Sequence, residues 1–173
     1  MTEKQEKILE AALKLFAEKG YSAVSTSKVA REAGVSEGLI FRHFTNKEGL
    51  LQAIMEQGRE RAQSLLGGVV MIEDPKDTLR AILSFPFEIN KSEHHYWRLI
   101  YALKWQADEY DQSMSLPMKK IAADAFRNLG YSNPEAEAEL VLILFDGLAT
   151  AQLLRKPSNM EEIRRALFDK YYL

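Results

Sequence analysis

Apolar side chains recur every three or four residues along almost the whole chain, the spacing of α-helices with one buried face. The first such segment is Lys4–Lys19, which carries Ile8, Ala12 and Phe16 on its predicted buried side and ends before Gly20. No segment shows the alternation of apolar and polar residues that is typical of a strand. We therefore predict an all-α protein of about nine helices with short connections.

The residues from Ser25 to Asn46 predict two short helices joined by a tight turn. Ser25 and Ser36 are predicted N-caps, and Gly34 supplies the permissive backbone that ends the first of the two helices. Ile40 and Phe44 are four residues apart and anchor one face of the second helix. This arrangement is typical of a DNA-binding helix-turn-helix, in which the second helix enters the major groove.

The bounds of the remaining helices are predicted from capping residues and from glycine and proline. The next begins at Thr45 or Asn46, either of which can cap it, and Thr45 with Glu48 fits a capping box. It runs to about Leu66, where Gly67-Gly68 should break it. Five more helices are predicted over Asp74–Asn90, in which Pro86 should cause a kink or an early end, and over Ser92–Tyr110, Ser115–Leu129, Asn133–Lys156 and Asn159–Tyr172, the last opened by a capping box of Asn159 with Glu162.

Composition says more about where the protein is located than about what it does. The chain has 173 residues, a formal net charge of −2 and no cysteine. The missing cysteines exclude disulfides and thiolate metal sites and fit a reducing cytoplasm, which is the predicted location. The N-terminus lacks a signal-peptide pattern, and the longest apolar run, Leu140 to Leu154, is too short to span a membrane. We expect no membrane partner.

The helix-turn-helix and its flanks resemble the N-terminal domain of TetR-family (tetracycline-repressor-like) transcriptional regulators. The resemblance runs from about Lys7 to Leu51. It rests on Ile8-Leu9-Glu10-Ala11-Ala12, Leu15-Phe16, Gly20-Tyr21, Val29-Ala30, Ala33-Gly34-Val35-Ser36, Phe41-Arg42-His43-Phe44 and Lys47-Glu48-Gly49-Leu50-Leu51. It implies a three-helix DNA-binding domain over residues 1–47 and a helical ligand-binding and dimerisation domain over residues 48–173.

The resemblance, read with the predicted outward face of the second helix, gives candidate DNA contacts. Arg42 is the best candidate for a charged base or phosphate contact, and His43 matches the family's usual phosphate-contacting position. Glu37 can accept from a cytosine amine but repels phosphate, and Phe41 replaces the family's usual tyrosine and loses its hydroxyl. The full set of candidates is Ser25, Ser36, Glu37, Gly38, Leu39, Phe41, Arg42, His43 and Lys47.

In the family, the C-terminal helices form a ligand pocket, and here aromatic residues are the candidates for its lining. Aromatic residues at helical spacing are more often core than ligand site, so both interpretations stay open. The candidates for ligand contact are Phe85, His94, Trp97, Tyr101, Trp105, Phe126 and Phe145. They suggest an apolar or aromatic small-molecule effector.

The helix predicted over Asn133–Lys156 is apolar nearly all round from Leu140 to Leu154, so it should be buried on two sides. One side can pack within the chain, and the other can meet a second copy of it. A homodimer would present two recognition helices to a roughly palindromic operator in double-stranded DNA. The predicted interface residues are Leu140, Leu144, Gly147, Ala151, Leu154, Ile163 and Leu167.

Catalytic signals are missing from the sequence. There is no glycine-rich phosphate loop, His-Glu-x-x-His motif or nucleophile elbow, and His94 and His95 are adjacent, so they cannot easily chelate one metal. We predict no catalytic residues, no metal and no cofactor. The predicted function is a ligand-released, sequence-specific DNA-binding regulator, most simply a repressor. The alternative is a helical small-molecule-binding or dimeric interaction protein without specific DNA binding, which Glu37 and Phe41 keep open.

Overall fold

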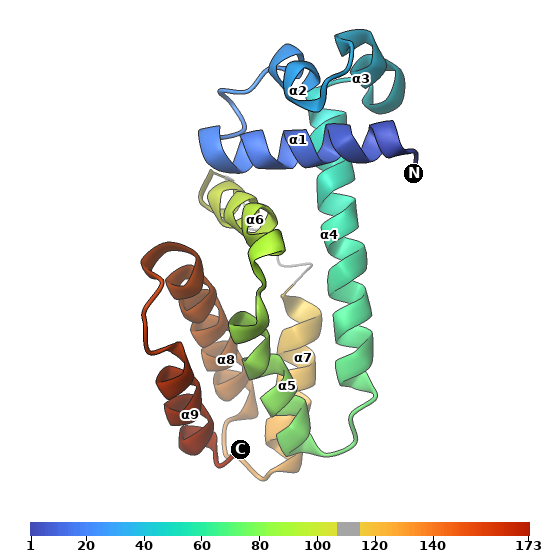
Figure 1. The fold of residues 1–173 in the computed structure, drawn as a ribbon. Helices are drawn as coiled ribbons and strands as arrows, with labels where there is room; N and C mark the ends of the chain where they lie inside the picture. The colour runs from blue at the N-terminus through green and yellow to red at the C-terminus, as the bar shows by residue number, and fades with distance from the viewer. Residues whose placement is uncertain (107–114) are drawn as a thin grey trace. The chain divides into compact units, whose positions relative to one another are not determined.

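A computed structural model describes residues 1–106 and 115–173, and all regular structure in these residues is helical (Figure 1). The prediction of an all-α protein is confirmed for this part of the chain. The α-helices are α1 (Glu3–Lys19), α2 (Thr26–Ala33), α3 (Glu37–Phe44), α4 (Lys47–Val70), α5 (Pro75–Glu88), α6 (His94–Gln106), α7 (Leu116–Asn128), α8 (Pro134–Thr150) and α9 (Met160–Tyr171). A 3-10 helix, η1 (Lys91–Glu93), precedes α6, and a π-helical segment, η3 (Ala151–Arg155), continues α8.

The chain divides into two compact units. The first unit comprises Met1–Arg61 and the segment that starts at Ser92, and the second comprises Ala62–Lys91 and the segment that ends at Leu173. The boundaries of these two units differ from the predicted boundary between the two functional domains, which lies after residue 47. That domain boundary stays a prediction.

The first unit has a core to which five helices and the loop before α2 contribute. Its buried residues are Ile8, Leu9, Ala11, Ala12, Leu15 and Phe16 of α1, Val24, Val29 and Ala30 around α2, Ile40 of α3, Leu50 and Ile54 of α4, and Tyr96 and Leu99 of α6. The spacing of the α1 residues is that of a single helical face, as the sequence predicts. Helix α6 packs against α1, so a segment far along the chain completes this core.

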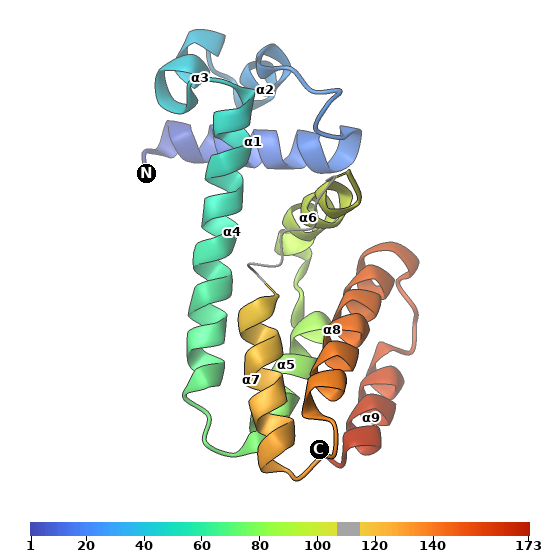
Figure 2. The same ribbon diagram turned by 180° about the vertical axis from the view of Figure 1, so that it is seen from behind.

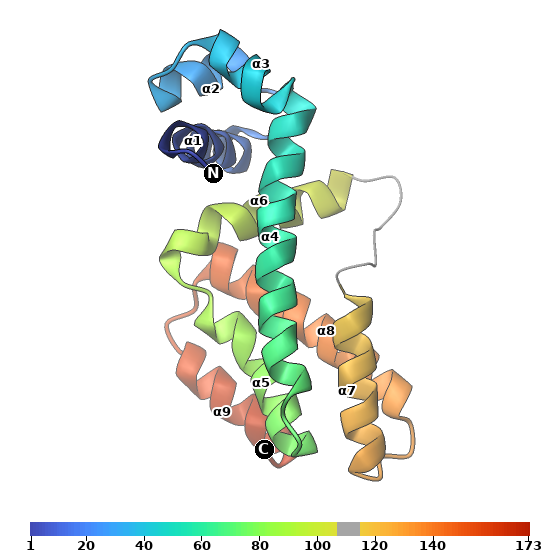
Figure 3. The same ribbon diagram turned by 90° about the vertical axis from the view of Figure 1, so that its right-hand side faces the viewer.

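The second unit is built on α5, α7, α8 and α9. Helices α7 and α8 run in opposite directions and are joined by a turn at Gly130, as Figures 2 and 3 show, and α5 packs against both. The buried residues include Leu83 of α5, Phe126 of α7, Val141 of α8 and Tyr171 of α9. The sequence predicts each of these helices, and the structure shows that they share one core.

The prediction that Gly67-Gly68 breaks α4 is wrong, because the helix continues to Val70. Glycine ends a helix most readily when it adopts a left-handed conformation, as Gly34 does with φ of 67°. The glycines with positive φ in the described residues are Gly20, Gly34 and Gly130, so the pair in α4 stays helical. Its cost is only the low helix propensity of glycine, about 1 kcal/mol per residue relative to alanine.

The caps are confirmed at some helices and wrong at others. Ser25, Asn46 and Asn133 accept hydrogen bonds from backbone N–H groups in the first turns of α2, α4 and α8. Ser36 and Asn159 make no side-chain cap hydrogen bond, and Thr45 ends α3 with φ of 68° instead of opening α4. The backbone conformations differ at the three sites: Ser36 has the extended conformation that is usual for an N-cap, Asn159 has φ of −106° and ψ of 33°, and Thr45 has a positive φ.

The other helix boundaries are close to the predicted ones. Helix α5 passes Pro86 and ends two residues later at Glu88, consistent with the early end that the proline predicts. The helix predicted over Asn133–Lys156 is α-helical to Thr150 and π-helical over Ala151–Arg155. Lys156, with φ of 49°, then ends it.

A close contact joins α4 and α6 within the first unit. Tyr96 is 9% exposed, and a Cβ atom at Gly58 would lie 1.7 Å from the Tyr96 hydroxyl oxygen. Among the described residues the hydroxyl has no hydrogen-bond partner, and burial raises the pKa of this phenol, so the group is held neutral. A buried hydroxyl without a partner loses its hydrogen bonds to water and gains nothing in return.

Removing this hydroxyl should therefore stabilise the protein. We expect Tyr96→Phe to raise the free energy of unfolding by about 1 kcal/mol, because the ring stays and only the unpaired oxygen is lost. Urea unfolding followed by circular dichroism measures the change. A clear loss of stability in Tyr96→Phe would show that the hydroxyl has a stabilising partner in solution.

Candidate nucleic-acid interface

Helices α2 and α3 form the helix-turn-helix that the sequence predicts (Figure 1). The Gly34 N–H donates to the carbonyl oxygens of Ala30 and Arg31, which closes the end of α2 in a left-handed turn. Val29 and Ala30 of α2 and Ile40 of α3 are buried in the core of the first unit. The apolar sides of both helices are thus fixed, and the opposite side of α3 faces solvent.

The solvent face of α3 carries most of the predicted DNA contacts. Gly38 and Arg42 are exposed, and Phe41 is 49% exposed, a large apolar ring left in water. Leu39 is half-buried and packs against the core of the first unit, so less of it is available to DNA than the sequence predicts. Ser25 and Ser36 are exposed at the N-terminal ends of α2 and α3, where backbone N–H groups favour an anion.

Glu37 has a partner that the sequence analysis missed. The Thr26 hydroxyl donates a 2.6 Å hydrogen bond to the Glu37 carboxylate, and both residues are half-buried. The bond links the first turn of α2 to the first turn of α3. The two residues are eleven positions apart, so no local pattern in the sequence signals the pair. Glu37 therefore makes a structural contact between the two helices, in addition to any contact that it makes with DNA.

Lys47 also takes part in a structural contact. Its ammonium group donates to the Tyr21 carbonyl oxygen at 3.1 Å and lies 4.3 Å from the centroid of the Tyr21 ring. The Tyr21 hydroxyl donates in turn to Glu48 at 3.2 Å. Burial first, and then Glu48, raises the pKa of Tyr21. The carbonyl and the ring offset the unfavourable position of a cation at a helix N-terminus, so a phosphate is not needed to explain Lys47.

His43 lies near the C-terminal end of α3, the predicted recognition helix, and is half-buried. Its Nδ1 atom is 3.4 Å from the Gln5 side-chain nitrogen, and its ring meets the Phe44 ring edge-on, with centroids 6.3 Å apart. Arg42 and His43 thus come from consecutive positions of α3, one exposed and one partly packed. Their arrangement suits contacts with DNA phosphates or base edges.

The family model described as bacterial regulatory proteins of the tetR family matches residues 8–54, which cover α1, α2, α3 and the start of α4. Residues 8–54 of this chain therefore match the TetR family. The chain is 44% identical over 179 residues to the uncharacterized HTH-type transcriptional regulator YuxN of Bacillus subtilis (strain 168), covering 94% of this chain and 61% of YuxN.

Solved structures share the fold of this chain. One is a transcriptional regulator of the TerR/AcrR family from Aquifex aeolicus VF5, with a TM-score of 0.71, 19% identity and 98% coverage of both chains. Another is a gamma-butyrolactone receptor described as an ArpA-like protein, with a TM-score of 0.74, 20% identity, and coverage of 96% of this chain and 86% of the receptor.

The curated relatives are longer than the regions that match. The matched regions span 61% of YuxN and 32% of each of two other regulators from the same Bacillus strain. The activity and partners of the whole protein are therefore proposals.

The predicted ligand contacts fall in both units of this chain. In the second unit, the rings of Phe85 and Phe145 stack with centroids 5.6 Å apart, whereas Phe126 is fully buried and packs against Tyr131 and Tyr171. In the first unit, His94, Trp97 and Tyr101 are half-buried on α6. The side chain of Trp105 lies outside the described residues. Phe126 thus has a core role, and the others stay predictions.

The predicted dimer residues divide into exposed and buried ones. Leu140, Gly147 and Leu154 are exposed, Leu144 and Ile163 are half-buried, and Ala151 and Leu167 are buried within the chain. Ile143, which the sequence analysis missed, is 61% exposed on α8 between Leu140 and Gly147. Leu140, Ile143 and Gly147 lie at helical spacing, so we call these three residues the outer face of α8.

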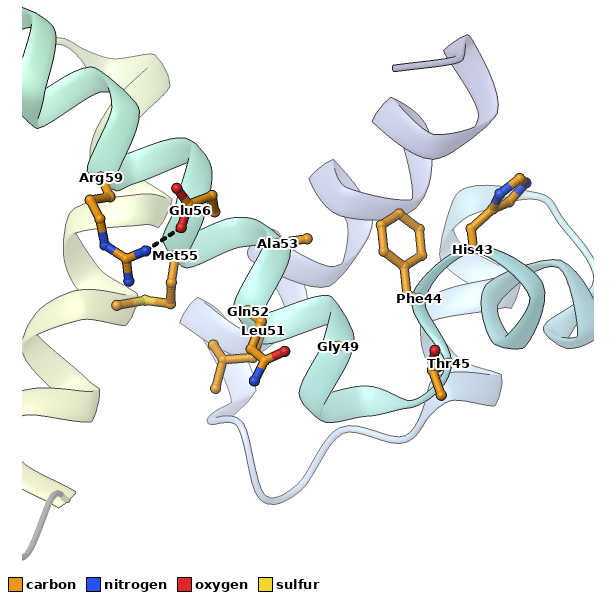
Figure 4. Close-up of a pocket in the computed structure, with 10 residues that line it drawn as sticks. All are labelled: His43, Phe44, Thr45, Gly49, Leu51, Gln52, Ala53, Met55, Glu56 and Arg59. Carbon is orange, nitrogen blue, oxygen red and sulfur yellow. Dashed lines mark hydrogen bonds and ion pairs between the residues drawn. The ribbon is translucent and has the colours of Figure 1, made fainter.

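An open groove lies beside the recognition helix in the first unit (Figure 4). Its lining residues are His43, Phe44, Thr45, Gly49, Leu51, Gln52, Ala53, Met55, Glu56 and Arg59. Glu56 and Arg59 form an ion pair at one end of it. Among the described residues there is no group of three or more His, Asp or Glu side chains that could hold a metal, and no helix there is long and apolar enough to cross a membrane.

Proposed function

We propose that this chain is a sequence-specific DNA-binding transcriptional regulator that acts as a homodimer. The observation that carries the proposal is the recognition helix, which Ile40 anchors while Gly38, Phe41 and Arg42 face solvent. The match of residues 8–54 to the TetR family supports it. Because the protein must reach chromosomal DNA, we also propose a cytoplasmic location.

The acidic side chain of Glu37 does not argue against DNA binding. Its bond to Thr26 gives the carboxylate a structural role between α2 and α3. The exposed ring of Phe41 can still contact a thymine methyl group or a sugar without a hydroxyl. The alternative function, a helical binding protein without specific DNA contacts, therefore loses both of the features that favoured it.

DNA binding is tested with the DNA that flanks the protein's own gene. Fluorescence anisotropy should show binding that is much tighter than to a scrambled duplex of the same composition, and the affinity should fall steeply with added salt. Equal affinity for both duplexes would contradict sequence-specific recognition and favour the alternative function.

The outer face of α8 supports the proposed homodimer. Monomeric proteins seldom leave contiguous large apolar side chains in water, and Leu140 and Ile143 are exposed beside Gly147, which has no side chain to hold a partner away. A partner helix against this face would bring two recognition helices to a roughly palindromic operator.

Ile143→Arg should convert this dimer to monomer, because a second copy would have to bury an unpaired guanidinium group. Sedimentation velocity at micromolar concentration measures the assembly. Leu116→Arg is the matched control, since Leu116 is also exposed but lies on α7 instead of α8. A monomeric wild-type protein, or an Ile143→Arg variant that stays dimeric, would contradict the proposed interface.

We further propose that the regulator is a repressor released by an apolar or aromatic small molecule. The stacked Phe85–Phe145 pair of the second unit supplies suitable contacts. The ligand would favour a dimer whose recognition helices no longer match successive major grooves, by no more than its difference in affinity for the two states. Hydrophobic compounds that raise the melting temperature of the protein should also weaken operator binding. A broad library in which no compound has this effect would contradict the proposal.

A further inference from the structure

Gln5 connects the start of the chain to the recognition helix. Its backbone N–H donates to the Thr2 hydroxyl at 3.3 Å, and its side-chain oxygen accepts from the Thr2 backbone N–H at 2.8 Å. These two bonds form a capping box at the start of α1. The other end of the same amide reaches His43 of α3, with 3.4 Å between Gln5 Nε2 and His43 Nδ1.

The direction of these hydrogen bonds fixes where the His43 proton lies. The Thr2 backbone N–H can only donate, so the Gln5 atom facing it must be the oxygen Oε1. The Gln5 atom facing His43 is then the NH₂ group, which can also only donate. His43 Nδ1 must therefore accept, and the neutral ring carries its proton on Nε2.

We infer that Gln5 is a positioning residue for DNA binding, which holds neutral His43 in the Nε2–H tautomer and so presents a hydrogen-bond donor to a DNA phosphate. Nε2 is the ring nitrogen farther from the backbone, and the edge-on contact with Phe44 limits rotation of the ring. The opposite tautomer would present a lone pair to the phosphate and repel it. This inference rests on the proposed DNA-binding function only for the phosphate contact.

Gln5→Glu reverses the hydrogen bond without removing the cap. Glutamate is a standard residue at this position of a capping box, so one carboxylate oxygen can still accept from the Thr2 N–H. The other oxygen can only accept, which requires a proton on His43 Nδ1. Gln5→Met is the matched control, because it keeps the chain length but provides no hydrogen bond and leaves both tautomers open.

Two-bond ¹H–¹⁵N spectra of the free protein at pH about 9, where a histidine ring in water is neutral, report the tautomer directly. We expect the wild-type protein to carry the His43 proton on Nε2, Gln5→Glu to carry it on Nδ1, and Gln5→Met to show a mixture. A wild-type proton on Nδ1, or an unchanged pattern in Gln5→Glu, would overturn the inference without any reference to DNA.

Operator binding at the same pH tests the consequence. Gln5→Glu should weaken binding at least tenfold, because each half of the dimer loses one hydrogen bond to a charged phosphate. In a His43→Ala background the same substitution should have almost no further effect. Equal losses in both backgrounds would show that Gln5 acts through its charge and would overturn the positioning role. A wild-type protein that binds no operator but shows the expected spectra would refute the proposed function while confirming the tautomer.

Discussion

Changing Arg42 and His43 together to alanine should weaken operator binding about a hundredfold or more. A base contact from Arg42 accounts for about 1–3 kcal/mol, and the loss of the His43 donor adds to it. Because a dimer places two recognition helices on the operator, each lost contact counts twice. Arg42 is exposed and His43 half-buried at the surface of α3, so we expect the fold to tolerate the change.

The control for this variant is Arg165→Ala. Arg165 is exposed on α9, in the unit that does not contain the recognition helix, and its loss changes the net charge by the same amount. Arg165→Ala should bind operator as tightly as the wild-type protein, and only the α3 variant should show a reduced dependence of affinity on salt. Undiminished operator affinity in the α3 variant would place the DNA-binding surface elsewhere.

Gly58→Leu should lower the free energy of unfolding by about 2–4 kcal/mol. A Cβ atom at this position would lie 1.7 Å from the Tyr96 hydroxyl oxygen and 2.0 Å from the ring carbon that bears it. The Tyr96 ring is buried and packs edge-on against Trp97, with centroids 5.4 Å apart, so it cannot move aside freely. Helices α4 and α6 would have to separate within the first unit.

Gly67→Leu in the same helix provides the comparison. A Cβ atom at Gly67 would have no neighbour within 4 Å, so the higher helix propensity of leucine should leave stability unchanged or raise it slightly. Adding Tyr96→Ala to Gly58→Leu should recover part of the loss, which a double-mutant cycle in urea would measure. Equal stability of the Gly58 and Gly67 variants would mean that the contact with Tyr96 is not tight in solution.

Local signals in the sequence were sufficient to predict the helices and the helix-turn-helix. Ile40 and Gly34 act through the backbone and side-chain spacing of their own segment, and both behave as predicted. Gly67-Gly68 did not behave as predicted, because a glycine permits a helix end without requiring one. The continuation of α4 depends on whether the chain needs to turn there, which composition does not encode.

Contacts between distant segments could not be predicted. The sequence assigns α6 to the second predicted domain, yet Tyr96 and Leu99 complete the core around α1. The same limit applies to the candidate site. The roles of Lys47 and His43 depend on a carbonyl of Tyr21 and an amide of Gln5, and a single sequence gives no periodicity from which such pairs could be inferred.

The bond between Thr26 and Glu37 has a consequence for engineering. Recognition helices are attractive parts to transplant between regulators when a new operator preference is wanted. Moving α3 alone from this protein would separate Glu37 from Thr26, which lies on α2, and would leave a half-buried carboxylate facing whatever the recipient carries there. The smallest portable module is therefore the helix pair from Ser25 to Phe44, and chimeras that split it should be less stable than chimeras that keep it.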